Sequence, residues 1–97
     1  MLDAHVIWDL VDEPKGNVAH VAANDLTTEE VEDVLLDPNS DTNVSRSSGE
    51  RITFGHASTG RYIAVLWQHV MDDPLTIRPI TAYEVPEPRQ RRRSGER

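Results

Sequence analysis

The chain has 97 residues, of which 37% are hydrophobic and 28% are charged, and its mean hydropathy is −0.55. This length predicts one small domain with a single core. No apolar run approaches the roughly 20 residues that a membrane-spanning helix needs, and the acidic N-terminus does not resemble a secretory signal. Because the sequence has no cysteine, a disulfide framework and a cysteine-ligated zinc site are excluded. A cytoplasmic protein is expected.

Charge is distributed unevenly along the sequence. Residues 1–45 hold one basic and eleven acidic residues, a net charge of −10, whereas residues 46–97 hold nine arginines and six acidic residues, a net +3. The overall charge of −7 repels phosphate at long range, which disfavours general nucleic-acid binding. Four arginines could still form a local phosphate-binding face if the fold gathers them: Arg46, Arg51, Arg61 and Arg78. The alternative is that each is a solvated residue at the end of a strand.

The first half of the sequence predicts one short strand and two helices. Residues 5–8 are mostly β-branched and aromatic, which favours a strand, and residues 9–24 have a weak helical pattern that a glycine interrupts. The second helix has the clearest local signal, because Thr27 and Glu30 have the spacing of a capping box. This helix is expected to end before Pro38, since the residue that precedes proline resists helical geometry.

The second half of the sequence predicts a meander of strands, beginning with a weak strand near residues 42–45. Polar and apolar residues alternate over 51–54, which predicts a half-buried strand. Residues 61–67 are apolar on both faces, which predicts a central strand covered on both sides. A further strand is expected over residues 75–80, where Pro79 cannot donate to the ladder and therefore marks an edge or a bulge.

The order of these elements predicts an α+β fold. We expect a single domain over residues 1–85, in which the N-terminal strand and two helices pack on an antiparallel sheet of three or four strands, with the helices on one face. Residues 86–97 are rich in proline and arginine and are expected to form a disordered tail.

Neither a metal site nor a cofactor site is predicted. Gly55 and Gly60 have the spacing of the glycines in a phosphate-binding loop, but Arg61 and Tyr62 follow where that motif needs lysine and then serine or threonine. The histidines stand at positions 5, 20, 56 and 69 without the spacing of metal ligands. The two glycines are more simply interpreted as hairpin residues.

The order and spacing of several segments resemble the BrnT family of toxins. The segments that carry the resemblance are Trp8-Asp9, Asn17, His20, residues 30–35, Asp37-Pro38, and residues 50–55, 59–63 and 77–82. Together they span about residues 6–84. The resemblance implies a RelE-like fold and a small bacterial ribonuclease of a type II toxin–antitoxin pair. It also implies a cognate antitoxin as partner, through which the protein can form oligomers.

The resemblance further implies metal-independent cleavage of RNA, in which the 2′-hydroxyl attacks the adjacent phosphate. Arg51, Arg61 and Arg78 are then the expected phosphate clamps, because a guanidinium group donates in a fork to phosphate oxygens. His20 and Tyr83 are the expected proton-transfer residues. The alternative roles are an ordinary surface histidine for His20 and a weak surface ion pair for Arg51.

Departures from the family pattern leave other hypotheses open. The family's Lys-His-Gly is Ala19-His20-Val21 here, and its late Ser-Ala-Arg is Thr81-Ala82-Tyr83. A tyrosine at position 83 removes one fixed positive charge from the presumed site, a loss that can slow cleavage by a factor of roughly hundreds or more. The main alternative is a catalytically inactive BrnT-like domain that binds or regulates a protein. A stand-alone domain of unrelated function is the third hypothesis.

Overall fold

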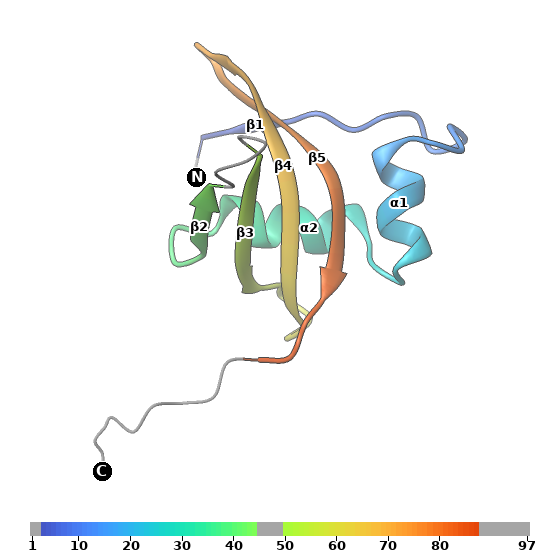
Figure 1. Ribbon diagram of the computed structural model, residues 1–97, viewed down its shortest axis with the longest axis vertical. Coiled ribbons are helices and arrows are strands. Elements are labelled where there is room, and N and C mark those ends of the chain that lie inside the picture. Colours follow the sequence, from blue (N-terminus) through green and yellow to red (C-terminus); the bar gives the residue numbers. More distant parts are fainter. Residues whose placement is uncertain (1–2, 45–49, 88–97) are drawn as a thin grey trace.

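The computed structural model describes residues 3–44 and 50–87, so Arg46 and most of the predicted tail lie outside the described residues. In chain order the elements are β1 (His5–Val6), α1 (Asn17–Ala23), α2 (Thr28–Leu36), β2 (Asp41–Val44), β3 (Arg51–His56), β4 (Tyr62–Asp72) and β5 (Leu75–Glu84) (Figure 1). Within the described ranges, neither helix has the length and apolar character needed to cross a bilayer.

The strands form one five-stranded sheet in the order β1-β5-β4-β3-β2. Strands β2 to β5 pair antiparallel, whereas β1 pairs parallel with β5. The α+β class is confirmed, but the expected antiparallel sheet of three or four strands is a mixed sheet of five. A two-residue strand carries no signal of its direction, and a parallel pair is possible here because two helices and three strands provide the long connection that it needs.

The two helices occupy different positions around the sheet. α2 lies across one face and contacts β3 and β4, whereas α1 lies beside β5 (Figure 1). The prediction that both helices cover one face is therefore right for α2 and wrong for α1. The periodicity of a short helix identifies which of its sides is apolar, but it does not distinguish a sheet face from a sheet edge.

The start and end of α2 follow the sequence signals. The Glu30 backbone N–H donates to Thr27 Oγ1 at 3.1 Å, and the Thr27 N–H donates to Glu30 Oε1 at 3.2 Å, so the predicted capping box is confirmed. The helix ends at Leu36, two residues before Pro38. Its buried apolar residues are Val31, Val34 and Leu35.

The first helix is shorter than the sequence predicts. It begins at Asn17 after the N-cap Gly16, which has no side chain to cap it. The Asp9 carboxylate accepts the Asn17 N–H at 2.8 Å instead, so a residue eight positions earlier caps the helix. This contact folds residues 9–16 back on themselves, and a Cβ at Gly16 would lie 2.8 Å from the Cβ of Asp9.

Strand alternation gives the sheet two faces of different character. The face toward α2 carries the core, in which Ile63, Val65 and Trp67 are buried with the apolar residues of the helix. We call the opposite side the open face, because α2 lies behind the sheet and α1 beside it (Figure 1). The open face carries three rows in register: Ile52, Leu66 and Thr81; Phe54, Ala64 and Tyr83; His56 and Tyr62. The central strand β4 is therefore covered by a helix on only one side.

Gly55 in β3 has no side chain, which lets Ser40 and Val34 pack closely against the strand. A Cβ at this position would overlap the Ser40 side chain and lie 3.3 Å from Cγ1 of Val34. We expect Gly55→Ala to lower the unfolding free energy by about 2 kcal/mol through overpacking, as measured by urea denaturation. The Ser40 hydroxyl has no hydrogen-bond partner within the described ranges. The double variant Ser40→Gly/Gly55→Ala should therefore recover part of the loss, and no recovery would show that Ser40 is not the obstacle.

Candidate functional site

The structure brings together only some of the five predicted site residues. Arg78 and Tyr83 lie on β5, and His20 contacts that strand from α1. Arg51 begins β3, whereas Arg61 directly precedes β4. These two arginines lie at opposite ends of the β3–β4 pair, about 17 Å apart along a six-residue strand. The three arginines therefore do not form one phosphate clamp.

Arg61 is bound by carboxylates at one end of the sheet. Its Nε donates to Glu84 Oε1 at 3.2 Å, and its Nη1 lies 3.3 Å from Glu30 Oε1. The same nitrogen donates to the Asp25 carbonyl oxygen at 2.7 Å. These contacts join α2, the turn before it and the end of β5, so Arg61 has a structural role.

Arg51 is held by an aromatic ring on the face that carries the core. Its guanidinium carbon lies 5.6 Å from the centroid of the Trp67 ring, which is the range of a cation–π contact. The indole N–H of Trp67 donates to Thr53 Oγ1 at 2.7 Å, which fixes the ring beneath the guanidinium. Arg51 thus lies on the opposite side of the sheet from Tyr83.

Two carboxylates on α2 hold the β3–β4 turn. Thr59 Oγ1 donates to Glu30 Oε2 at 2.5 Å, and Ser58 donates to Asp33 Oδ2 through its backbone N–H at 2.9 Å and its hydroxyl at 2.7 Å. The Thr59 hydrogen bond lowers the pKa of Glu30 despite burial of the carboxyl. The Ser58 hydrogen bonds lower the pKa of Asp33. The hydroxyl side chains of Ser58 and Thr59 at the turn are the sequence signal for these hydrogen bonds with the carboxylates of α2.

These lowered pKa values predict a loss of stability in acid. A carboxyl whose pKa is lower in the folded state stabilises the fold above its unfolded pKa, and this stabilisation is lost as the pH falls through the folded pKa. We expect the unfolding free energy to fall below about pH 4.5, the ordinary pKa of Glu30. Urea denaturation between pH 3 and 7 should show a flatter profile for Glu30→Gln/Asp33→Asn. The exposed pair Asp12→Asn/Asp73→Asn is the control, and equal profiles for both variants would contradict the prediction.

Side chains of α1 and its C-cap form hydrogen bonds with the backbone carbonyls of β5 that the short β1 strand does not pair. Asn17 Nδ2 donates to the Pro79 carbonyl at 2.9 Å, and Asn24 Nδ2 donates to the Ala82 carbonyl at 2.8 Å. Between them, His20 Nδ1 lies 3.2 Å from the Ile80 carbonyl oxygen. The three polar residues project from one side of the helix, as their spacing of three and four residues requires. An edge strand left bare would present these carbonyls to other chains.

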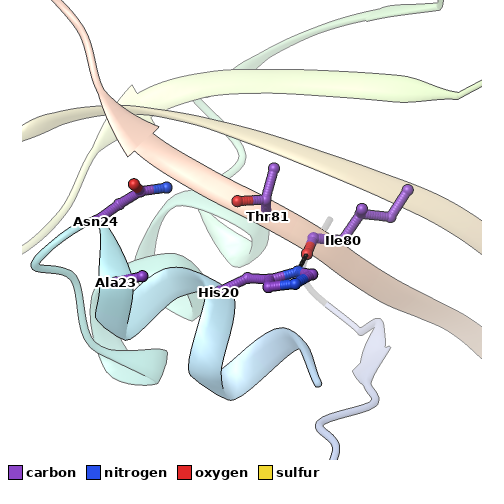
Figure 2. A pocket seen from close by; sticks show the side chains of 5 residues that line it. All are labelled: His20, Ala23, Asn24, Ile80 and Thr81. Carbon is purple, nitrogen blue, oxygen red and sulfur yellow. Dashed lines mark hydrogen bonds between the residues drawn. The ribbon is translucent and has the colours of Figure 1, made fainter. Parts of the chain in front are cut away.

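His20 lines a shallow pocket between α1 and β5. The pocket has a volume of about 400 Å³ and is lined by His20, Ala23, Asn24, Ile80 and Thr81 (Figure 2). Because a backbone carbonyl only accepts hydrogen bonds, the contact with Ile80 requires the proton on Nδ1 of His20. The other ring nitrogen, Nε2, then keeps its lone pair in the neutral ring. This tautomer can accept a proton.

A bulge in β5 brings Arg78 to the same side of the sheet as Tyr83. Pro79 pairs with Trp67 and Thr81 pairs with Leu66, so the register shifts by one residue and Ile80, directly after Pro79, is the extra residue. The prediction that the stretch 75–80 is an edge or ends in a bulge is thereby confirmed, with the bulge at Ile80. Without the extra residue, positions 78 and 81 would face opposite sides. Arg78 Nη2 donates to Asp9 Oδ2 at 2.6 Å.

The sequence predictions missed an aromatic cluster on the open face. The rings of Phe54 and Tyr62 stack with centroids 6.4 Å apart, and the rings of His56 and Tyr62 are 4.9 Å apart. His56 Nε2 lies 2.8 Å from Glu87 Oε2. The alternation over residues 51–56 could have placed Phe54 and His56 on one face, but their pairing with Tyr62 depends on the hairpin register.

We call His20, Arg78, Thr81 and Tyr83 the β5 site. His20 and Thr81 line the pocket, and Arg78 and Tyr83 lie on either side of Thr81 along β5. Within the described residues, His20 Nε2 has no hydrogen-bond partner. The arginine of the site already holds the Asp9 carboxylate, so an anionic ligand would have to replace that partner. No protein-family model, curated protein or solved structure matches this chain.

Proposed function

We propose that this protein is a BrnT-like ribonuclease toxin that cleaves RNA at the β5 site without a metal. In this proposal it acts in the bacterial cytoplasm and a cognate antitoxin neutralises it. The observation that carries the proposal is the hydrogen bond between His20 Nδ1 and the Ile80 carbonyl. This contact orients the ring and leaves Nε2 as the base in a pocket that Thr81 also lines, and Arg78 and Tyr83 lie on either side of Thr81 along β5.

The β5 site can supply the three functions that the reaction needs. His20 Nε2 takes the proton of the 2′-hydroxyl as its oxygen bonds to phosphorus. Arg78 exchanges Asp9 for the non-bridging oxygens, on which negative charge accumulates. Tyr83 protonates the 5′-oxygen as its bond to phosphorus breaks, which yields a 2′,3′-cyclic phosphate and a 5′-hydroxyl. A phosphate over Thr81 would have Arg78 and Tyr83 each about 7–10 Å away along the strand, within reach of their side chains.

The second candidate is a BrnT-like domain that binds or regulates a protein without cleaving RNA. The positions of Arg51 and Arg61 favour it, because one stacks on Trp67 and the other is held by carboxylates. Of the three arginines predicted as clamps and described here, only Arg78 reaches the β5 site. Under this hypothesis, His20 only satisfies the edge of β5.

The two candidates are distinguished by an RNA cleavage assay in the presence of a chelator. We expect the purified protein to cleave single-stranded RNA and to form cyclic phosphate ends. His20→Gln keeps a side-chain donor for Ile80 but has no base, so it should lose at least about 100-fold in rate and little stability. His69→Gln is the matched control, because it makes the same substitution near the hairpin tip, where His69 contacts Asp72, and it should retain the rate.

The outcome that decides for the second candidate is intact RNA after incubation with micromolar, correctly folded protein. Co-expression with the product of the adjacent gene then tests the partner. A toxin should arrest growth when expressed alone and not when expressed with its antitoxin.

A further inference from the structure

The open face combines stacked aromatic rings with carboxylates at the end where β3 finishes and β4 begins, around the His56–Tyr62 pair. Phe54 and Tyr62 stack on each other, and Asp41 pairs with Phe54 across β2 and β3, which places it in the same row. Glu87 reaches this end through its contact with His56. Burial raises the pKa of Tyr62, and the charges of Asp41 and Glu87 raise it further. Two carboxylates, those of Asp41 and Glu87, therefore lie near the aromatic rings.

Cationic groups are scarce at this end. Within residues 3–44 and 50–87, Asp41 has no ion-pair partner and Glu87 is paired only with His56. The nearest arginine along β4, Arg61, contacts Glu30 and Glu84 instead. Aromatic faces beside carboxylates favour a guanidinium group, which stacks on rings and donates to carboxylate oxygens. The same carboxylates repel the phosphates of RNA.

The sequence places such groups directly after the described domain. Residues 88–97 contain five arginines and one acidic residue, a net +4, whereas residues 1–87 carry a net −11. This segment starts one residue after Glu87, at the edge of the face. Four extended residues span about 13 Å. Neighbouring rows on one face of the sheet are about 6.6 Å apart, so this length covers two row-to-row steps from the His56 row. The chain after Glu87 is therefore long enough for the arginines at positions 91–93 to lie over Phe54 and Tyr62.

We propose that the arginine-rich segment 88–97 docks on the open face of its own domain, with guanidinium groups over Phe54 and Tyr62 and beside Asp41 and Glu87. The docking depends on opposite charge and on stacking, and it does not depend on whether the β5 site cleaves RNA. Because Tyr83 shares a row with Phe54, the docked segment borders the β5 site.

A spin label on the full chain tests this docking. The sequence has no cysteine, so Ser94→Cys gives one attachment point for a nitroxide. We expect strong broadening of the amide signals of Phe54, Tyr62 and Tyr83, and little broadening of Val34 and Leu35 behind the sheet. In Asp41→Asn/Glu87→Gln the broadening should fall about fivefold at low salt, whereas Asp72→Asn/Asp73→Asn removes the same charge from the hairpin tip and should change nothing.

Three results would overturn the proposal. The first is broadening that is absent, or equal on both sides of the sheet. The second is broadening that appears only when labelled and isotope-enriched chains are mixed, which identifies a second copy as the occupant. The third is an undocked tail together with shifts of Phe54 and Tyr62 on addition of oligouridylate, which identifies the face as an RNA-stacking surface.

Discussion

Asn17→Ala is expected to lower the unfolding free energy by about 3 kcal/mol, the largest loss for any single side chain discussed above. Asn17 is 1% exposed, and its amide joins three segments. Nδ2 donates to the carbonyls of Ile7 at 3.0 Å and Pro79 at 2.9 Å, while Oδ1 accepts the Asp9 N–H at 2.8 Å. Alanine leaves all three backbone groups without this partner. The midpoint of thermal unfolding should fall by roughly 15 °C.

Two further variants separate hydrogen bonding from shape at this position. Asn17→Asp preserves the shape and the acceptor but cannot donate to Ile7 and Pro79, so it should be at least as destabilising as alanine. Asn24→Ala removes one hydrogen bond at an exposed position and should cost about 1 kcal/mol or less. If Asn17→Ala and Asn24→Ala lowered the unfolding free energy equally, this would contradict the conclusion that the buried Asn17 amide joins three segments of the chain.

Arg78→Ala is expected to slow RNA cleavage by roughly 10²–10³-fold, the cost of losing one donor to the developing phosphorane charge. Arg78 lies on the β5 site, and its Nη2 already binds a carboxylate oxygen of Asp9 at 2.6 Å. The measurement is the single-turnover rate of RNA cleavage with chelator present. Arg78→Lys should recover only part of the rate, because an ammonium group lacks the fork of donors.

The matched controls are the other two arginines. Arg51→Ala removes a cation–π contact with Trp67, and Arg61→Ala removes the partner of Glu30 and Glu84. We expect both variants to lose stability but to retain the cleavage rate of the folded protein within about threefold, since a residue away from the reacting atoms changes the rate little. A loss at Arg51 as large as that at Arg78 would contradict the placement of the site on β5.

The sequence predicted those parts of the fold that depend on neighbouring residues. The capping box of Thr27 and Glu30 needs only a spacing of three, and the bulge that ends the stretch 75–80 follows from the missing N–H of Pro79. Both are confirmed. The first helix was predicted too long, because its cap comes from Asp9, and a side chain that caps from eight residues away leaves no periodic signal.

The candidate site was predicted only in part, and the reason differs among the residues. A pattern of residues shows that an arginine is present, but it does not show which carboxylates will lie beside it. Arg61 meets Asp25, Glu30 and Glu84 only after the sheet has formed. Tyr83 and Arg78 share a face only because of the bulge between them, and their sequence separation of five would otherwise place them on opposite faces.

The sequence by itself determined the α+β class, the capped second helix, the strands of the meander and the bulge after Pro79, because short-range sterics and hydrogen bonding decide these features. Only the tertiary structure decided that β1 pairs parallel with β5, that α1 covers a sheet edge, and that His20 contacts the strand that carries Arg78 while Arg51 and Arg61 lie elsewhere. Contacts between residues that are distant in the sequence depend on the strand order, on the register and on the face of the sheet on which each side chain lies. These are determined only when the whole core packs together.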